Sequence, residues 1–371
     1  MKKVAYIRAS NIYDDSRASK EINALVEHGY FVSVFGWDRC GFADQRCAET
    51  FKNENIRFFF FPVRIQPGQG NSLKNIIGWI RWLNKTLKQE KHDIIHACDL
   101  DSGISGYRYK KKTGCKLVYD IYDYYIDCHH VPKFTEPFLE REEIKIINHS
   151  DLTIICTEER IKQIEKASPK CTIVIHNSPQ VDALSTKSRG LLYDYVYCGS
   201  LCEYRLLNEV FERYHLNANI KIAIAGTGEF APKATELGEK YEQFSYFGTI
   251  PYAEVIEIES QSKVISAIYD PSLRNHQLCA PNKFYEALAL GKPIIVCKGT
   301  GIDEVVNRYN IGVVIDYDAE KFYIALNHLL QNPSMCAEMG KRARSLYEKK
   351  YQWNTMKGIL IDEYSKLSEK D

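Results

Sequence analysis

Short runs rich in β-branched and aromatic residues alternate with longer stretches of helical period along the whole chain. This alternation is typical of α/β folds in which helices connect parallel strands. The predicted strands of a first series are Lys3–Ile7, Phe31–Phe35, Ile56–Phe61, Ile94–Cys98, Lys116–Ile121, Leu152–Cys156 and Thr172–His176. Those of a second series are Tyr193–Cys198, Ile220–Ala225, Ser245–Gly248, Val264–Tyr269, Pro293–Val296 and Gly312–Ile315. The sequence therefore predicts two doubly wound, Rossmann-like domains that face each other across a cleft.

The length of 371 residues suits two domains of ordinary size. Between the two series, Ser178–Arg189 is polar, contains a proline and lacks a strong period, which predicts a linker. We expect the first domain over residues 1–180, the second over 190–350, and a C-terminal segment over 351–371. Ligands of open parallel sheets bind beyond the carboxyl ends of the strands, so the cleft is the predicted site.

Composition and charge exclude several classes of protein. Hydrophobic residues make up 45% of the chain and charged residues 26%, as in ordinary globular proteins. The net charge of +1 gives no reason to expect nucleic-acid binding. Residues 1–180 carry 27 basic and 23 acidic side chains, and the excess lies mostly between Lys74 and Lys116.

The twelve cysteines do not form a recognisable disulfide or zinc pattern. Cys156, Cys198 and Cys297 lie within or at the end of apolar runs, where cysteine usually acts as a small buried hydrophobe. No CxxC pair occurs. The sequence has neither an apolar signal-peptide core nor 18 consecutive apolar residues, so we expect a cytoplasmic protein with reduced thiols.

The most informative segment is Tyr269–Val296, which contains Pro281-Asn282-Lys283 before a helical run and Gly291-Lys292-Pro293 before a β run. A helix that begins near Asn282 offers unpaired N–H groups and a positive dipole end, which suit a phosphate. Lys283 would add positive charge there, and Glu286 could accept hydrogen bonds from the two hydroxyls of a ribose. The alternative is a capping box formed by Asn282 and Glu286.

Two glycine loops follow predicted strands of the second series. Gly199 follows one strand and is trailed by Arg205, whereas Gly226 and Gly228 follow the next. Glycine lets the backbone approach an anion, and arginine makes bidentate contacts with phosphate oxygens. The alternative is that each glycine simply makes a turn. Neither loop fits the dinucleotide or P-loop motif.

These motifs together resemble the sugar-donor half of a GT-B glycosyltransferase, and retaining family 4 most closely. The resemblance rests on the glycine loops, on Phe247-Gly248 with Ile250-Pro251-Tyr252, and above all on the segment Pro281–Ile295. The N-terminal half agrees through Asp15–Glu21, His96–Asp99 and Tyr119–Asp123, and Tyr351-Gln352-Trp353 resembles the segment that returns to the first domain.

The resemblance implies a role for each matching residue. Arg205 and Lys283 would hold the diphosphate and stabilise it as the leaving group, and Glu286 would bind the ribose. The glycines Gly199, Gly226 and Gly228, with Asn282, would surround the sugar donor. The implied reaction transfers a sugar from a nucleotide diphosphate sugar, with UDP-sugars expected first, to a glycan or polyprenol-linked acceptor, with retention and without a metal or other cofactor. Such a reaction fits synthesis of a cell-surface or capsular polysaccharide.

The sequence departs from the family pattern at three places. Leu278 stands where a second glutamate is frequent, so its role would fall to Arg274, Asn275 or His276 or be absent. Cys98 stands where histidine is frequent, and Asp120–Asp123 replaces an Asp-x-His-Glu pattern. Asp99 is the predicted acceptor-side group; the alternative is a helix N-cap. Asp99 with Asp101 also resembles the metal-binding DxD motif of GT-A enzymes, an interpretation we disfavour because the first strand lacks the GT-A opening.

The segment Asn71–Lys91 is amphipathic and basic, with Trp79 and Trp82 beside Lys and Arg. Such a helix suits the surface of an anionic membrane, and residues 107–112 add a basic cluster. The alternative is a helix whose apolar side packs on the sheet. For the whole chain, two further functions compete with glycosyl transfer. They are a sugar-nucleotide epimerase of GT-B shape and a catalytically silent subunit that binds a nucleotide or a partner enzyme.

Overall fold

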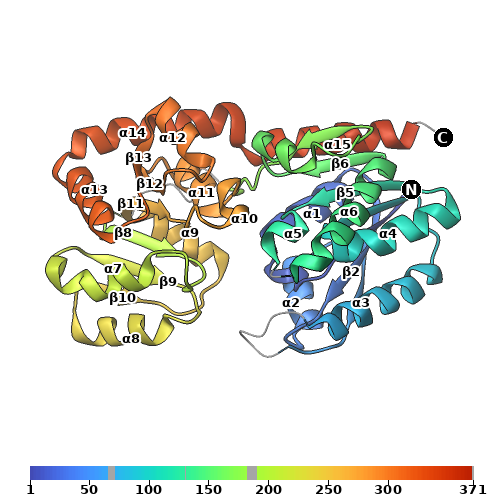
Figure 1. Ribbon diagram of the computed structural model, residues 1–371, viewed down its shortest axis with the longest axis horizontal. Coiled ribbons are helices and arrows are strands. Elements are labelled where there is room, and N and C mark those ends of the chain that lie inside the picture. Colours follow the sequence, from blue (N-terminus) through green and yellow to red (C-terminus); the bar gives the residue numbers. More distant parts are fainter. Residues whose placement is uncertain (66–71, 130, 182–189, 370–371) are drawn as a thin grey trace. The chain divides into compact units, whose positions relative to one another are not determined.

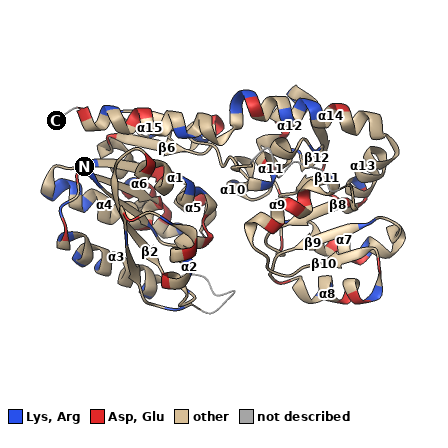
Figure 2. Ribbon diagram, turned by 180° about the vertical axis from the view of Figure 1, so that it is seen from behind, with Lys and Arg blue, Asp and Glu red and all other residues tan. Residues whose placement is uncertain are grey.

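The computed structural model describes residues 1–65, 72–129, 131–181 and 190–369 (Figure 1). The chain divides into two compact units. The first comprises Met1–His176 together with Asn354–Asp371, and the second comprises Asn177–Trp353. The predicted linker Ser178–Arg189 lies partly outside the described residues, because 182–189 are among those left out. Acidic and basic residues are spread along the chain in both units (Figure 2).

The first unit is built on a seven-stranded parallel sheet in the order β3-β2-β1-β4-β5-β6-β7. Each strand lies where the sequence predicts one. Register is set by pairs such as Lys3 with Phe31 and Val4 with Ile94. The strands are β1 (Lys3–Arg8), β2 (Phe31–Trp37), β3 (Ile56–Phe61), β4 (Ile94–Cys98), β5 (Lys116–Ile121), β6 (Leu152–Ile155) and β7 (Thr172–Val174).

Helices cover both faces of this sheet. They are α1 (Ser16–Glu27), α2 (Ala43–Thr50), α3 (Leu73–Thr86), α4 (Asp99–Thr113), α5 (Tyr125–Cys128), α6 (Glu136–His149) and α15 (Trp353–Glu369). Trp79, Leu100 and Ile147 of α3, α4 and α6 share one apolar core with Ala5 and Ile7 of β1. On the opposite face, α1 and α15 meet the strand side chains through hydrogen bonds, because Glu21 accepts one from Tyr6 and Tyr364 bonds to His96.

Helix boundaries follow local chemistry. Asp15 caps α1 by accepting a hydrogen bond from the N–H of Ala18 at 3.0 Å, and Ser72 caps α3 in the same way. Gly114 ends α4 in a left-handed conformation that glycine adopts without strain. Sequence-local signals therefore set these ends.

The second unit repeats the doubly wound plan with a six-stranded parallel sheet in the order β10-β9-β8-β11-β12-β13. The strands are β8 (Tyr193–Cys198), β9 (Ile222–Ala225), β10 (Phe244–Tyr246), β11 (Ser262–Ala267), β12 (Ile294–Cys297) and β13 (Gly312–Ile315). The helices are α7 (Leu207–Arg213), α8 (Ala231–Lys240), α9 (Tyr252–Ser260), α10 (Arg274–Gln277), α11 (Asn282–Leu290), α12 (Ile302–Tyr309), α13 (Ala319–Gln331) and α14 (Pro333–Leu346). Both predicted series of strands and the predicted fold class are confirmed.

The amphipathic segment adopts the packing alternative over most of its length. Trp79 is fully buried and stacks 6.0 Å from Trp37, and Trp82 packs against the same core. The other interpretation, in which both tryptophans lie at a membrane interface, is therefore wrong for Trp79. In the described part of this segment, the exposed apolar side chains are Leu73 and Ile77, in the first turns of α3. Asn71, where the predicted segment began, lies outside the described residues.

All twelve cysteines are free thiols, and Cys156, Cys198 and Cys297 are buried as expected. Among the described residues, no helix is long and apolar enough to cross a membrane.

Candidate functional site

The carboxyl ends of β8 and β9 form two interlocked loops. The N–H of Gly199 donates to the carbonyl of Ala225 at 2.9 Å, and the N–H of Leu201 donates to that of Thr227 at 2.9 Å. A Cβ added to Gly226 would lie 1.8 Å from the carbonyl oxygen of Gly199, and one on Gly228 would lie 2.4 Å from that of Leu201. Both glycines have positive φ. These glycines let the loops pack closely; their contact with a sugar donor stays a prediction.

Lys283 reaches these loops from the first turn of α11. Its side chain is only 8% exposed, its Nζ donates to the carbonyl of Cys198 at 3.2 Å, and it lies 4.6 Å from the ring centre of Tyr197. A Cβ on Gly199 would come within 2.7 Å of Nζ, so Gly199 also makes room for this lysine. Burial lowers the pKa of Lys283, but Tyr197, Tyr269 and Glu286 outweigh it and hold the pKa above its usual range. Lys283 is therefore a fixed positive charge.

Arg205 supplies a second cation beside Lys283. Its guanidinium lies 4.0 Å over the ring centre of Tyr269, and its Nη1 is 2.9 Å from Nε2 of His276. Burial raises the pKa of Tyr269, and the charges of both Lys283 and Arg205 act against that rise. Both cations thus lie close enough to Tyr269 to influence its hydroxyl.

Glu286 lies one helical turn after Lys283 and is 3% exposed. Its Oε1 accepts a hydrogen bond from the hydroxyl of Tyr252 at 2.9 Å. The capping-box alternative is wrong: Pro281 occupies the N-cap position of α11 without a side-chain hydrogen bond, and Asn282 is the first helical residue. Asn282 itself is exposed.

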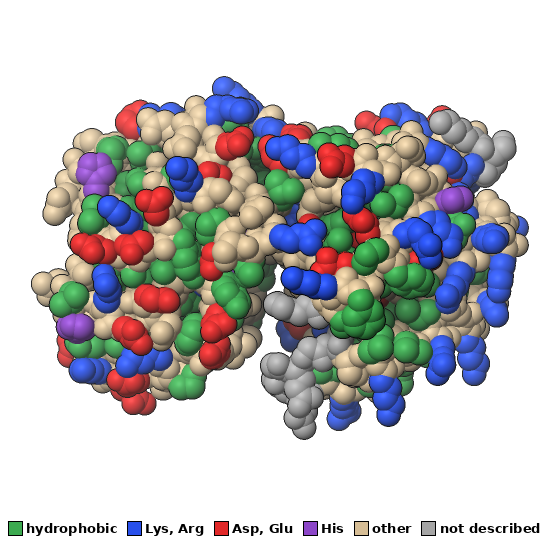
Figure 3. All heavy atoms as spheres, in the orientation of Figure 1, with side chains coloured by type: hydrophobic (Ala, Val, Ile, Leu, Met, Phe, Trp, Pro, Cys, Tyr) green, Lys and Arg blue, Asp and Glu red, His purple; other side chains and the backbone are tan. Residues whose placement is uncertain are grey.

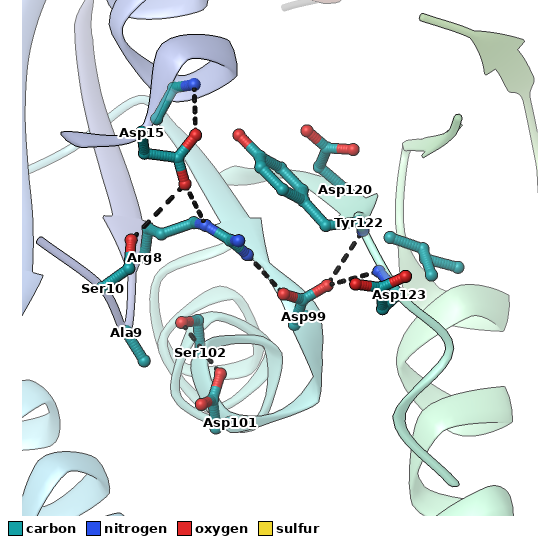
Figure 4. Close-up of polar contacts among 12 residues, drawn as sticks. Arg8, Ala9, Ser10, Asp15, Asp99, Asp101, Ser102, Asp120, Tyr122 and Asp123 are labelled. Carbon is teal, nitrogen blue, oxygen red and sulfur yellow. Dashed lines mark hydrogen bonds and ion pairs between the residues drawn. The ribbon is translucent and has the colours of Figure 1, made fainter. Parts of the chain in front are cut away.

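Asp99 lies in the first unit, at the junction of β4 and α4 (Figure 4). Its Oδ1 accepts hydrogen bonds from the backbone N–H groups of Tyr122 at 2.9 Å and Asp123 at 3.3 Å, and its Oδ2 pairs with Arg8. The N-cap alternative is wrong, because Cys98 occupies that position and Asp99 is helical residue one, with φ of 59°. Burial, with the charge of Asp101 among others, raises the pKa of Asp99 to about 7, although Arg8 opposes this.

Arg8 is a member of this cluster that sequence reasoning missed. Its Nε donates to Asp15 at 2.7 Å, and its guanidinium lies 3.6 Å over the ring centre of Tyr122 (Figure 4). Its position could have indicated a functional role, because Arg8 ends the first strand and ligands of parallel sheets bind beyond the carboxyl ends of the strands.

Behind this cluster lies a second, fully buried group of charges that the sequence did not predict. Arg17 donates to Asp120 at 2.6 Å and to Glu21 at 2.9 Å, and Nε2 of His96 is 3.3 Å from Asp120. His96, Cys98 and Asp120 are ligand types for zinc and lie within 4.8 Å of one another. Because Arg17 already neutralises Asp120, we interpret this group as a network of ion pairs and hydrogen bonds that holds the strand ends together, and not as a zinc site.

Two family models match successive parts of the chain. The family described as glycosyl transferases group 1 matches residues 196–346, and glycosyltransferase family 4 matches residues 20–178. The chain is a GT-B glycosyltransferase resembling family 4. A search of curated proteins found no match.

Solved structures share the fold of this glycosyltransferase at low sequence identity. Sucrose-phosphate synthase from Thermosynechococcus elongatus is 14% identical with a TM-score of 0.72, and 100% of each chain is covered. HepE from Anabaena, solved in complex with UDP-glucose, is 14% identical with a TM-score of 0.68, covering 99% of this chain and 100% of that one. A UDP-N-acetylglucosamine 2-epimerase is 13% identical with a TM-score of 0.58, covering 92% and 90%.

The glycosyltransferase brings most of its predicted sugar-donor residues together in the second unit. The three glycines, Lys283, Glu286 and Arg205 surround the ends of β8 and β9 and the start of α11, whereas Asp99 belongs to the first unit. Sequence reasoning missed Tyr252 as the partner of Glu286, although Tyr252 belongs to a segment that carries the family resemblance.

Leu278 follows α10 of the glycosyltransferase, where the family often has glutamate. Of the three residues considered as substitutes, His276 is tied to Arg205 by one ring nitrogen and to the carbonyl of Asp270 by the other, at 2.9 Å. Oδ1 of Asn275 is buried and has no hydrogen-bond partner in the described part of the chain. Asn275 is therefore the candidate to replace the missing glutamate, because its side-chain oxygen can still accept a hydrogen bond.

Proposed function

We propose that the protein is a retaining hexosyltransferase that moves a sugar from a nucleotide diphosphate sugar, with UDP-sugars first, to a glycan or lipid-linked glycan acceptor. The proposed pathway is synthesis of a cell-surface or capsular polysaccharide. The bond between the anomeric carbon and the diphosphate oxygen breaks, and a bond to the acceptor hydroxyl oxygen forms as that hydroxyl passes its proton to the departing diphosphate. Negative charge develops on the departing diphosphate and must be stabilised.

The observation that carries this proposal is the pairing of two cations with one oriented carboxylate at the carboxyl ends of the second sheet. Lys283 is buried, charged and fixed by the carbonyl of Cys198. Arg205 lies over Tyr269, and Glu286 is oriented by Tyr252. Two fixed cations suit a diphosphate, and a buried carboxylate suits the vicinal hydroxyls of a ribose. These cations would stabilise the negative charge of the departing diphosphate, a role that a divalent metal ion has in other enzymes.

On the acceptor side we propose Asp99 as the group that holds the acceptor hydroxyl. Backbone N–H groups of Tyr122 and Asp123 fix its carboxylate, and Arg8 pairs with it. A carboxylate held in this way can accept a further hydrogen bond from a hydroxyl without rearranging.

The epimerase stays a second candidate, because a UDP-N-acetylglucosamine 2-epimerase shares the fold. A panel of UDP-, GDP- and ADP-sugars, with thermal-shift screening against the matching nucleoside diphosphates, separates the alternatives. Transfer to a glycan acceptor supports the proposal, and release of a free epimer supports the epimerase. Binding of a nucleotide without turnover of any sugar donor supports a silent subunit.

Substitutions test the assignment of the sugar-donor site. Lys283→Ala and Glu286→Ala should each lower kcat/KM for the sugar donor by about a hundredfold or more, because each removes a charged contact in a buried site. Matched controls are Lys233→Ala and Glu236→Ala on α8, which form a solvent-exposed pair with each other. Near-wild-type values for both site variants would refute the assignment.

We also propose that the protein contacts anionic membranes from a basic surface of the first unit. Lys and Arg side chains gather over α3 and α4 (Figure 3). A cavity of about 400 Å³ is lined by Lys88, Lys91, Arg108 and Lys112 among others, and Leu73 and Ile77 are exposed on α3. Each cation near an anionic surface contributes on the order of 1 kcal/mol. If the protein fails to sediment with phosphatidylserine vesicles at low salt, the membrane proposal is wrong.

A further inference from the structure

Glu259, in the last turn of α9, carries a buried carboxyl group. Its side chain is 0% exposed, and neither Oε1 nor Oε2 has a partner within the described part of the chain. Buried polar atoms are almost always paired, so an orphaned carboxyl in a well-packed unit calls for a physical reason.

The neighbours of Glu259 belong to the proposed sugar-donor site. Helix α9 packs against both α11 and β8. Tyr252, in the first turn of α9, bonds to Glu286, so one helix contacts that carboxylate at its start and carries a second carboxyl further along. Burial raises the pKa of Glu259 well above its usual range, the charge of Glu286 raises it further, and Lys283 opposes both. The positive charge of Lys283 therefore acts on both carboxyl groups, Glu259 and Glu286.

The two carboxyl groups cannot both be ionised at low cost in a buried site. Glu286 receives a hydrogen bond from Tyr252, which stabilises its charged form, whereas Glu259 receives none from the described residues. The proton therefore resides on Glu259, and the charges of Glu286 and Lys283 balance each other.

Burial shifts the pKa values of the other titratable groups around Glu259, upward for Cys198 and Tyr252 and downward, to about 8, for Lys292. Burial, then the charges of Glu259 and Glu286, raises the pKa of the Cys198 thiol on β8. Burial and Glu286 raise that of Tyr252 on α9 itself. Lys292 is turned to the carbonyls of Ser260 and Ser262.

We propose that Glu259 is a positioning residue of the sugar-donor site, kept as a neutral acid behind Glu286 so that Lys283 serves the diphosphate and not a second carboxylate. The inference rests on the proposed donor function. Ionisation of Glu259 would place a second negative charge near Lys283 and oppose an incoming diphosphate.

The test is calorimetric titration of the full-length protein with UDP, GDP and ADP between pH 7 and 10. We expect affinity for the preferred diphosphate to fall with rising pH more steeply in the wild type than in Glu259→Gln and Glu259→Leu, which cannot ionise at this position. Both variants should match the wild type within about threefold at pH 7 and bind at least tenfold more tightly than the wild type where Glu259 is ionised. Glu236→Gln, an exposed control, should follow the wild type.

Every outcome of this experiment bears on the inference. Equal pH dependence in the wild type and Glu259→Gln, or pH-independent binding by the wild type, overturns the role of Glu259 and leaves the donor function intact. Failure of the wild type to bind any of the three diphosphates overturns the donor function and this inference together. If Glu259→Leu unfolds, the melting temperature of Glu259→Gln decides: a neutral acid predicts that Glu259→Gln stabilises the protein more at pH 8 than at pH 5, and the opposite sign overturns the inference.

Discussion

The hydroxyl of Tyr252 donates a hydrogen bond to Oε1 of Glu286 across 2.9 Å, joining the first turn of α9 to the middle of α11. Glu286 is 3% exposed, whereas Tyr252 is 39% exposed. The tyrosine thus connects a buried carboxylate to the surface of the second unit. It fixes the orientation of the group that we propose to bind the ribose of the sugar donor.

Tyr252→Phe should weaken binding of the sugar donor while leaving the fold intact. Loss of a hydrogen bond to a charged group costs about 1.5–3 kcal/mol, which corresponds to roughly a ten- to hundredfold higher KM for the sugar donor. Steady-state kinetics with the donor varied measures this change. Tyr309→Phe is the control, since Tyr309 is similarly exposed at 40% but lies on α12. An unchanged KM in Tyr252→Phe would mean that Glu286 needs no such partner.

Gly226→Ala should destabilise the second unit. The residue has φ of 131°, and an added Cβ would meet the carbonyl oxygen of Gly199 at 1.8 Å, so the two strand-end loops must separate. Strained φ and displaced backbone together cost about 2–5 kcal/mol, which lowers the melting temperature by roughly 5–15 °C in a domain of this size.

Gly248→Ala is the matched control for this prediction. Gly248 also has positive φ, 62°, but a Cβ there would meet nothing within 4 Å. Differential scanning calorimetry should therefore show a much smaller shift for Gly248→Ala. Equal shifts for the two variants would attribute the whole effect to φ and none to the contact between loops.

Much of the fold was predictable because parallel strands carry a strong local signal. β3, β4, β5, β8 and β13 have the predicted bounds, since each is a compact β-rich run between turn residues. The strand after Lys221 is shorter than predicted, because Ile220 packs in the core next to a turn and does not join the ladder. Apolar character alone does not reveal which residues pair.

The site was predictable only where the functional residues share one short segment. Lys283 and Glu286 lie three positions apart on one helix, so sequence spacing brought them together. Arg8 and Glu259 were missed because their significance depends on residues distant in sequence: Arg8 pairs with Asp99, 91 positions away. The packing role of the strand-end glycines was also not predictable from the sequence, because only the folded structure shows that Gly226 faces the backbone of Gly199.

Glu143 in the first unit should make stability depend on pH. Burial raises its pKa to about 8, although hydrogen bonds from the Tyr119 hydroxyl and the N–H of Tyr125 oppose the rise. The native state therefore keeps a proton that the unfolded chain loses near pH 4.5. Between about pH 4.5 and pH 8 the unfolded state binds fewer protons, so stability falls as the pH rises, by a few kcal/mol at most.

Glu143→Gln should remove the contribution of this group to the slope, because the amide cannot ionise. Melting temperatures followed by circular dichroism from pH 5 to 8 measure the difference. Glu140→Gln on the same helix is the control, since Glu140 forms a surface pair with Lys166 and such pairs contribute little. A slope that is the same in wild type and Glu143→Gln would place the ionisation elsewhere.

Transfer should not require a divalent metal. We propose that Lys283 and Arg205 supply the positive charge at the diphosphate. Enzyme and sugar donor treated with excess EDTA should retain activity within about twofold of the untreated sample, because fixed cations provide the electrostatic stabilisation. Loss of activity that Mg²⁺ or Mn²⁺ restores would contradict this prediction and favour Asp99 and Asp101 as metal ligands.

Asp99 should set the acid side of the pH profile for transfer. Burial, with the neighbouring carboxylates Asp101 and Asp123, raises its pKa to about 7 against the effect of Arg8. A carboxylate that holds the acceptor hydroxyl must be ionised, so kcat should fall as the pH drops below about 7. Asp99→Asn should lower kcat by about a hundredfold or more and abolish this acid dependence.

The exposed residue Asp44 on α2 provides the control for Asp99, and Asp44→Asn should keep both the rate and the profile of the wild type. Initial rates at saturating sugar donor, measured from pH 5 to 9, separate the effect on kcat from any effect on donor binding. An acid limb that persists unchanged in Asp99→Asn would assign the ionisation to another group. The geometry around Tyr122 would then have a structural role, with Asp99 joining the ends of β1, β4 and β5 through Arg8 and the two backbone N–H groups.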